Sequence, residues 1–448
     1  MGKAWEARRS VPALFAVCFI IAVYVNVPTS RDGVPMISAF PFAVIGGVMF
    51  LDRALSQEAI GAVLLALGVF ACSLLATDFW TYLDVRALAF GQYIYSTLIG
   101  LTLYWTVQSF SAKEVTRFSE IAIIIMLCGA VLEITTPLSS AIDSVMNPLF
   151  GLDKYAEIIQ NRDVAIGFGL RRPKFFSSET SYFAMALCFL ICTYAYLSPQ
   201  KGATIRAGVF AVLGLLVARS PILIFALVFI GLGQFLGGGA TGRRTNVDRM
   251  ALGLVIAVPM LLGSYFLLTE LFEARLAQVT SGADYSSTYR TYGSWYAALA
   301  VLSEYPLFGV GIGSINAAFR PLTQTYLSLG IPAFSVMYEW RFQIQNLPAA
   351  LIIYLGSLGT IFYLNYLYFY TRAIVGHIGW QGWTLFLILS ATASAFYSPR
   401  YITYYFLIVG ITKIANLKRT VTEAVHTPQG LVNSRSKSQP ISVKHNIY

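Results

Sequence analysis

Residues 347–371 read LPAALIIYLGSLGTIFYLNYLYFYT, and this stretch decides the fold class. It holds no charged residue, and it is long enough to cross a bilayer, because a membrane-spanning helix needs about 20 apolar residues. The rest of the chain has the same character, since 57% of its 448 residues are hydrophobic and only 12% are charged. Soluble domains carry about 25% charged residues. The sequence therefore predicts an all-α polytopic membrane protein.

Similar apolar runs recur along the chain and predict about 12 transmembrane helices. The seventh and eighth are the least well separated. A single bent span there would reverse the orientation of every later span in the membrane. The predicted spans are Val11–Val27, Val34–Leu51, Ala59–Ala76, Ala87–Phe110, Ile121–Pro137, Ser178–Leu197, Ile205–Ala218, Pro221–Leu236, Met250–Thr269, Leu347–Thr371, Gly379–Tyr397 and Tyr401–Ala415. Residues 1–416 thus form a transmembrane helical domain, and residues 417–448 are expected to be a disordered basic cytoplasmic tail.

The distribution of basic residues predicts the orientation. With the N-terminus inside, most Lys and Arg residues fall in the inner loops and the tail, and only Lys154 and Lys174 among the lysines lie outside. This arrangement satisfies the positive-inside rule and predicts that both termini are cytoplasmic. Two long polar segments, residues 138–177 and 270–345, then become loops on the outer face.

Composition narrows the possible chemistry. A net charge of +10 that is spread through loops fits anionic headgroups better than nucleic acid. All five cysteines fall inside hydrophobic runs, so no disulfide framework is indicated. The only histidines are His377, His426 and His445, and all are on the predicted cytoplasmic side. Proton abstraction at the outer face would therefore fall to a carboxylate, a tyrosine or the substrate.

Arginines persist on the predicted outer face, where the positive-inside rule predicts few. An anionic ligand such as a phosphate is the expected reason. Arg219, between two apolar runs in ARSP, either snorkels at the membrane rim or binds a phosphate at the mouth of a cavity. The arginines of the long loops are Arg162, Arg171, Arg172, Arg275, Arg290, Arg320 and Arg341.

Glu179 lies in GLRRPKFFSSETSYFAMAL, residues 169–187, which leads into the sixth span. Ser177 or Ser178 is a suitable N-cap, and a carboxylate in the first turn would complement the helix dipole. Alternatively, Glu179 is a general base that faces an outer cavity beside Arg171 and Arg172. Both interpretations are compatible with the sequence.

The second long loop contains SSTYRTYGSWYAALAVLSEYPLFGVGIGSINAAF, residues 286–319. Its periodicity predicts a helix over Thr291–Tyr305, with Trp295 and neighbouring tyrosines forming either an interfacial face or a platform for sugar stacking. The GxGxG run at 309–313 lacks the spacing of a nucleotide-binding loop and follows no strand. A tight glycine turn that re-enters the bundle is expected instead.

Four separated pieces resemble the O-antigen polymerase and ligase superfamily of membrane glycosyltransferases. They are FFSSETSYFA (175–184), ARS (218–220), Arg290 with Trp295 and EYPLFGVGIGS (304–314), and QNLPAALIIYLGSLG (345–359). The resemblance covers roughly Gly169–Phe369. Ala218 departs from the family's serine, and Gln345, followed by Asn346, stands where ligases carry a histidine. The second departure favours a polymerase.

This resemblance implies a GT-C-like membrane glycosyltransferase of the bacterial inner membrane with a periplasmic active face. Its substrate would be an undecaprenyl-diphosphate-linked oligosaccharide, its partners the lipid bilayer and a chain-length regulator, and no cofactor, metal or nucleic acid is expected. The expected catalytic residues are Glu179, Arg219 and Arg290, with Glu304 and Glu339 as further candidates for the base. The expected substrate-binding residues are Arg171, Arg172, Arg341, Glu339, Gln345 and Trp295.

Two other functions remain open. An O-antigen ligase would transfer finished glycan to an acceptor such as a lipid A core. A lipid-linked oligosaccharide flippase would need a polar path through the bilayer and often shows inverted repeats. The predicted spans hold few ionisable residues, of which Glu133 is one, and the sequence shows no internal repeat.

Overall fold

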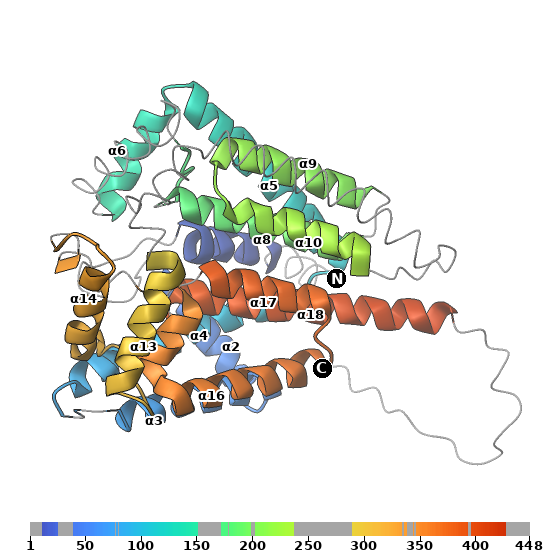
Figure 1. Cartoon of the computed structure of the whole chain (residues 1–448). Coiled ribbons are helices and arrows are strands. Elements are labelled where there is room, and N and C mark those ends of the chain that lie inside the picture. The colour runs from blue at the N-terminus through green and yellow to red at the C-terminus, as the bar shows by residue number, and fades with distance from the viewer. Residues whose placement is uncertain are drawn as a thin grey trace, which may run out of the picture.

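A computed structural model describes most of the chain as a bundle of helices (Figure 1). No strand occurs among the residues that it describes. These residues are 11–25, 39–76, 78, 80–150, 172–177, 179–198, 202–236, 289–333, 336–337, 344, 346–392 and 396–426.

A described helix overlaps each predicted span except Met250–Thr269, which lies outside the described residues, but the helix ends differ from the predicted ones, since α5, for example, begins at Ala112 rather than Ile121. Four helices, α3, α5, α8 and α16, are long and apolar enough to cross a membrane, which identifies a helical membrane protein. The elements are η1 (Phe19–Val25), α2 (Phe40–Asp52), α3 (Gln57–Leu74), α4 (Leu83–Val107), α5 (Ala112–Thr135), α6 (Leu138–Phe150), α8 (Thr180–Leu197), α9 (Ala203–Ala218), α10 (Ile222–Leu236), η3 (Tyr289–Gly293), α13 (Ser294–Glu304), η4 (Ile315–Ala318), α14 (Phe319–Ser328), α16 (Leu347–Val375), α17 (Trp380–Thr392) and α18 (Pro399–His426).

The surface of α5 shows why this bundle suits a bilayer. One face of α5 is buried against the bundle, with Ile123 and Ala130 fully covered. The opposite face exposes Ile121, Ile125 and Leu132. Large apolar side chains in contiguous exposed patches indicate contact with lipid, because water would disfavour them.

The seventh and eighth predicted spans are separate helices. Helix α9 ends at Ala218 and α10 begins at Ile222, and the two lie side by side as a hairpin (Figure 1). Pro221 directly precedes α10, where its missing N–H costs no helical hydrogen bond. The single bent span that the sequence also allowed is therefore not formed.

Contacts between helices define two ends of the bundle. At the first end, α5 finishes and α8, α10 and α18 begin. We call it the arginine end, because Arg172, Arg219 and Arg400 lie there. At the far end, Lys413 Nζ lies 3.1 Å from Glu58 Oε1, and Arg206 Nη1 lies 3.4 Å from Glu120 Oε1. Helix α5 therefore runs towards the arginine end, and α8, α10 and α18 run away from it.

The two segments predicted as loops contain helices of their own. Helix α13 confirms the helix predicted over Thr291–Tyr305, whereas α6 in the first segment and α14 in the second were not predicted; all three lie at the same end of the bundle in Figure 1. The last helix also differs from expectation, because α18 continues to His426, beyond the predicted start of the tail at residue 417. A helix of this length, at about 1.5 Å per residue, exceeds the thickness of a hydrocarbon core.

Candidate functional site

A buried carboxylate holds the chain segment 172–177, which leads into α8. Glu133, near the end of α5, is only 2% exposed. Its Oε2 accepts a hydrogen bond from the backbone N–H of Phe175 at 2.7 Å, and its Oε1 accepts one from the N–H of Lys174 at 3.1 Å. Successive backbone N–H groups that converge on one anion form a nest. Glu133, which the sequence marked only as an ionisable residue inside a span, therefore orders this segment.

The same segment adopts an unusual backbone conformation. Phe175 and Phe176 have φ values of 40° and 68°, in the left-handed region that residues with a Cβ rarely adopt. Gly129 on α5 makes room for the Phe175 ring, because a Cβ at this position would lie 2.0 Å from Phe175 Cε2. The hydroxyl of Tyr24 also donates a hydrogen bond to the carbonyl oxygen of Phe175. These contacts offset the strain and determine the path of the segment that carries Arg172.

Arg219 occupies the turn between α9 and α10 in a left-handed conformation, with φ 48° and ψ 45°. Its N–H donates to the carbonyl oxygen of Leu215 at 2.9 Å, which closes the end of α9. Glycine is the usual residue at such a C-terminal position, because it has no Cβ to clash. An arginine here costs about 1–2 kcal/mol of local strain. Strained residues of this kind cluster at functional sites.

Arg172, in the segment 172–177 before α8, contacts the same turn. Its Nε donates to the carbonyl oxygen of Ala218 at 3.4 Å, so its guanidinium contacts the residue that precedes Arg219. Both arginines are half-buried, and burial lowers the pKa of the Arg219 guanidinium below its usual value. Guanidinium groups remain protonated at neutral pH. The structure therefore brings the Arg172 side chain to the turn that carries Arg219, from a part of the sequence that is distant from it.

Glu179 lies directly before α8 and is half-buried. It occupies the N-cap position itself, so the predicted cap at Ser177 or Ser178 is displaced towards the helix. The Glu179 side chain makes no capping hydrogen bond, and Ser181 Oγ instead donates to Glu179 Oε2 at 2.9 Å. The carboxylate therefore does not close the helix, although its backbone starts it.

Arg400 is a basic residue of this end that the sequence reasoning missed. It lies at the start of α18, and its Cζ is 3.2 Å from the centre of the Tyr182 ring in the first turn of α8. Cation–π contacts orient a guanidinium while leaving its charge in place. The only signal in the sequence was its position between two adjacent apolar runs, in YSPRY, where the polar break is short.

The glycine-rich run forms a re-entrant turn, as predicted, and we call residues 306–314 the glycine loop. It lies against a break in α16, where Gly356 has φ 64° and ψ −164°. The N–H groups of Val310 and Gly311 donate to the carbonyl oxygens of Ile353 and Tyr354, at 3.0 and 2.9 Å. A broken helix leaves such carbonyls without their usual partners.

The other side of the break is paired in the same way. The N–H of Ser357 donates to the carbonyl oxygen of Pro306 at 2.9 Å, and that of Leu358 donates to Leu307 at 3.0 Å. In transporters, the carbonyls of broken helices coordinate ions. Here the chain itself occupies them, so two sequence pieces that are far apart pack as one unit.

The structure describes only some of the remaining residues that the sequence predicts for the site. Trp295 is in the first turn of α13 and is 45% exposed, and Glu304 is exposed at the end of the same helix. Arg290 lies in η3, and only its backbone is described. Arg171, Arg341, Glu339 and Gln345 lie outside the described residues.

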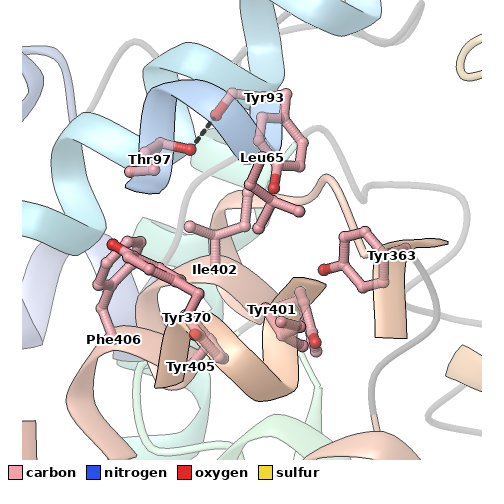
Figure 2. Close-up of a pocket in the computed structure, with 11 residues that line it drawn as sticks. Leu65, Tyr93, Thr97, Tyr363, Tyr370, Tyr401, Ile402, Tyr405 and Phe406 are labelled. Atoms are coloured by element: carbon pink, nitrogen blue, oxygen red, sulfur yellow. Dashed lines mark hydrogen bonds between the residues drawn. The ribbon is translucent and has the colours of Figure 1, made fainter. Parts of the chain in front are cut away.

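A pocket lined by tyrosines lies inside the bundle between α3, α4, α16 and α18 (Figure 2). It leaves room for about one water molecule, which is far too little for a sugar ring. Its rim is hydrogen-bonded, since the Tyr405 hydroxyl is 2.8 Å from Thr371 Oγ1 and the Tyr370 hydroxyl donates to Glu58 O at 2.6 Å. The lining residues are Ala62, Leu65, Tyr93, Thr97, Tyr363, Leu367, Tyr370, Tyr401, Ile402, Tyr405 and Phe406. This pocket is part of the packed core rather than a substrate site.

Comparison with known proteins adds no functional assignment, because the chain matches no family model and no curated protein. The charges at the arginine end favour one class of ligand. Arg172 and Arg219, with the positive ends of the α8 and α10 dipoles beside them, favour a ligand with negative charge.

Proposed function

We propose that the chain is a membrane glycosyltransferase that polymerises undecaprenyl-diphosphate-linked oligosaccharide repeats into a surface polysaccharide. The observation that carries this proposal is the convergence of Arg172 and Arg219 at the turn between α9 and α10. Arginine matches the geometry of phosphate oxygens through bidentate, charge-assisted hydrogen bonds. A diphosphate at the level of the membrane surface is the ligand that fits two half-buried guanidinium groups at the end of a lipid-facing bundle.

The reaction transfers a growing glycan between two lipid-linked molecules. A hydroxyl oxygen of the new repeat bonds to the anomeric carbon of the growing chain, and the bond from this carbon to the diphosphate oxygen breaks. The diphosphate leaves with the electron pair and its lipid. Arg172 and Arg219 would stabilise the charge that develops on it, a role for which preorganised donors are effective.

The hydroxyl proton needs an acceptor. We assign this role to Glu179, because its carboxylate is half-buried at the arginine end and forms no capping bond with α8. A carboxylate positioned within hydrogen-bonding reach is a common general base. Arg290 in η3 is proposed to bind the diphosphate, and Trp295 in the first turn of α13 is proposed to stack on a sugar.

The proposal includes an architecture and an orientation. Twelve spans with a GT-C-like arrangement would place the arginine end in the periplasm and both termini in the cytoplasm of the inner membrane. The far end carries Lys413, Lys418 and Arg206, as the positive-inside rule requires of a cytoplasmic face. A chain-length regulator remains an expected partner on the grounds of the family resemblance.

A deletion strain tests this function directly. Surface glycan and lipid-linked intermediates are sized side by side in the deletion strain and in the complemented strain. A polymerase is supported if long chains disappear while single repeats still reach the surface. Long chains that remain on the lipid carrier would indicate a ligase, and repeats trapped on the cytoplasmic face would indicate a flippase.

A further inference from the structure

A fully buried arginine lies beneath the glycine loop. Arg86, in the first turn of α4, has a side chain that is 0% exposed. Its Nε donates to Ser314 Oγ at 2.9 Å, and its Nη2 donates to the carbonyl oxygen of Val310 at 3.0 Å. Both acceptors belong to the loop that fills the break of α16. Arg86 therefore ties this loop to α4.

The loop is shaped around the arginine. Gly311 has φ 83°, and a Cβ there would lie 2.8 Å from Arg86 Nε. A Cβ on Gly313 would lie 2.5 Å from the carbonyl oxygen of Val85. The N–H of Ile312 also donates to Ser73 Oγ on α3, at 3.2 Å. An apolar side chain would fill the space of Arg86 without the cost of burying a charge, so the retained cation needs a role.

The glycine loop follows α13 directly and ties the end of that helix to α16, against which α13 also packs. Arg290 lies at the opposite end of the helical stretch, about 21 Å away at 1.5 Å per residue. A tilt of about 10° at the loop would move Arg290 by roughly 4 Å at this lever length. Misplacement of a binding group by about 1 Å is enough to slow catalysis about a hundredfold.

We infer that Arg86 is a positioning residue, which holds the glycine loop in the break of α16 and thereby fixes where the helical stretch of η3 and α13 presents Arg290 to the lipid diphosphate. The inference rests on the proposed function for the role of Arg290. We call the attachment of the glycine loop to Arg86 the lock. It concerns structure alone, so it can be tested without an activity assay.

Accessibility of the loop tests the lock. Val310 is 0% exposed, so Val310→Cys in a background without the native cysteines should resist a membrane-impermeant maleimide. Adding Arg86→Gln should expose the cysteine and raise its labelling at least fivefold. Arg86→Lys should lie between the two, because one ammonium cannot serve both acceptors in the fixed geometry of a guanidinium. Unchanged labelling in Arg86→Gln would overturn the inference.

Two glycines provide a matched pair for the same assay. Gly311 and Gly330 both have positive φ, 83° and 79°, but a Cβ on Gly330 meets nothing within 4 Å. Alanine strains the backbone similarly at both positions, and only Gly311→Ala adds the clash with Arg86. Gly311→Ala should therefore raise the labelling of Val310→Cys, and Gly330→Ala should leave it unchanged. Equal labelling in the two variants would contradict the lock.

Kinetics with the lipid-linked repeat tests the positioning role. At equal amounts of folded protein, Arg86→Gln should raise KM for this substrate about tenfold, with partial recovery in Arg86→Lys. A purely structural defect would lower the yield of folded enzyme and leave KM unchanged once the rates are normalised to folded protein. An unchanged KM together with increased labelling would overturn the positioning role. If the wild-type protein polymerises nothing, the proposed function fails, whereas the labelling results still decide the lock.

Discussion

The Cζ atom of Arg400 lies 3.2 Å from the centre of the Tyr182 ring, so the start of α18 is joined to the first turn of α8. These residues are more than 200 positions apart in the chain. Glu179 lies one helical turn before Tyr182, and the N–H of Tyr182 donates to the Glu179 carbonyl oxygen at 3.1 Å. The contact therefore adds a third arginine to the end that already contains Arg172 and Arg219.

Substitutions of Tyr182 and Arg400 should separate the contribution of the Tyr182 ring to polymerisation from that of its hydroxyl. Tyr182→Phe keeps the aromatic face and should retain glycan length, whereas Tyr182→Leu removes the face and should shorten the glycan. Cation–π contacts are worth about 0.5–2 kcal/mol, so polymerisation should fall about twofold to thirtyfold in Tyr182→Leu. Arg400→Ala should be at least as severe. Polymer length on gels, normalised to protein amount, measures this, and full activity in Arg400→Ala would exclude a role for the pair.

Arg219 allows function to be separated from stability. Arg219→Gly relieves the left-handed strain and should raise the unfolding free energy by about 1 kcal/mol. The same change removes a guanidinium from the proposed site and should lower polymerisation about 10²–10³-fold. Thermal unfolding in detergent and glycan sizing measure the two effects. A stabilised Arg219→Gly variant that still makes long chains would remove Arg219 from the mechanism.

Arg219→Lys and Arg290→Ala extend this test. Lysine keeps the charge but lacks the planar fork, so Arg219→Lys should recover little activity. Arg290→Ala should abolish chain extension with expression retained. Normal chain length in Arg290→Ala would limit the diphosphate site to the described corner at Arg172 and Arg219.

Glu179 can be tested for its two possible roles by one substitution. Serine is among the preferred N-cap residues, so Glu179→Ser preserves the start of α8. If Glu179 is the general base, Glu179→Ser and Glu179→Gln should both lower the turnover rate about 10²–10⁴-fold. If it acts only at the helix start, Glu179→Ser should be nearly as active as the wild type. Rates measured with purified lipid-linked repeats distinguish these outcomes.

Glu133 should matter for stability far more than an exposed carboxylate. Glu133→Gln leaves backbone N–H groups of the 172–177 segment with a weaker acceptor and should cost about 1–3 kcal/mol. Glu120 pairs with Arg206 at the far end, where the Arg206 side chain is 52% exposed. Glu120→Gln should therefore change stability by less than about 1 kcal/mol. Equal melting temperatures in the two variants would argue against the nest.

A pair of helical glycines tests the same segment by packing. Gly129→Ala would place a Cβ against the ring of Phe175, whereas a Cβ on Gly91 meets nothing within 4 Å. Alanine at Gly91 should be neutral or stabilise α4 by up to about 1 kcal/mol. Alanine at Gly129 should destabilise by about 1–3 kcal/mol, because the ring must move. Thermal unfolding of both variants measures the difference.

Local sequence was sufficient for the positions of most helices. Charge-free runs such as 347–371 must form helices in lipid, because no other open structure satisfies every backbone group there. The same reasoning could not decide whether residues 205–236 form one helix or two, since periodicity continues through ARSP. It also could not find the break at Gly356, because the N–H and C=O groups that fill it come from residues 306–311.

The arginine content of the predicted outer loops was visible in the chain, and the positive-inside rule made it informative. Which arginines meet was decided only by tertiary structure. Arg172 contacts Ala218 because Glu133 bends the segment before α8, and Arg400 meets Tyr182 because α18 begins beside α8. Hydropathy determines that a segment is a helix and approximately where it ends, since the cost of unpaired backbone groups in lipid depends on that segment alone. Partners across the bundle depend on packing between helices that are distant in sequence, and no local pattern encodes them.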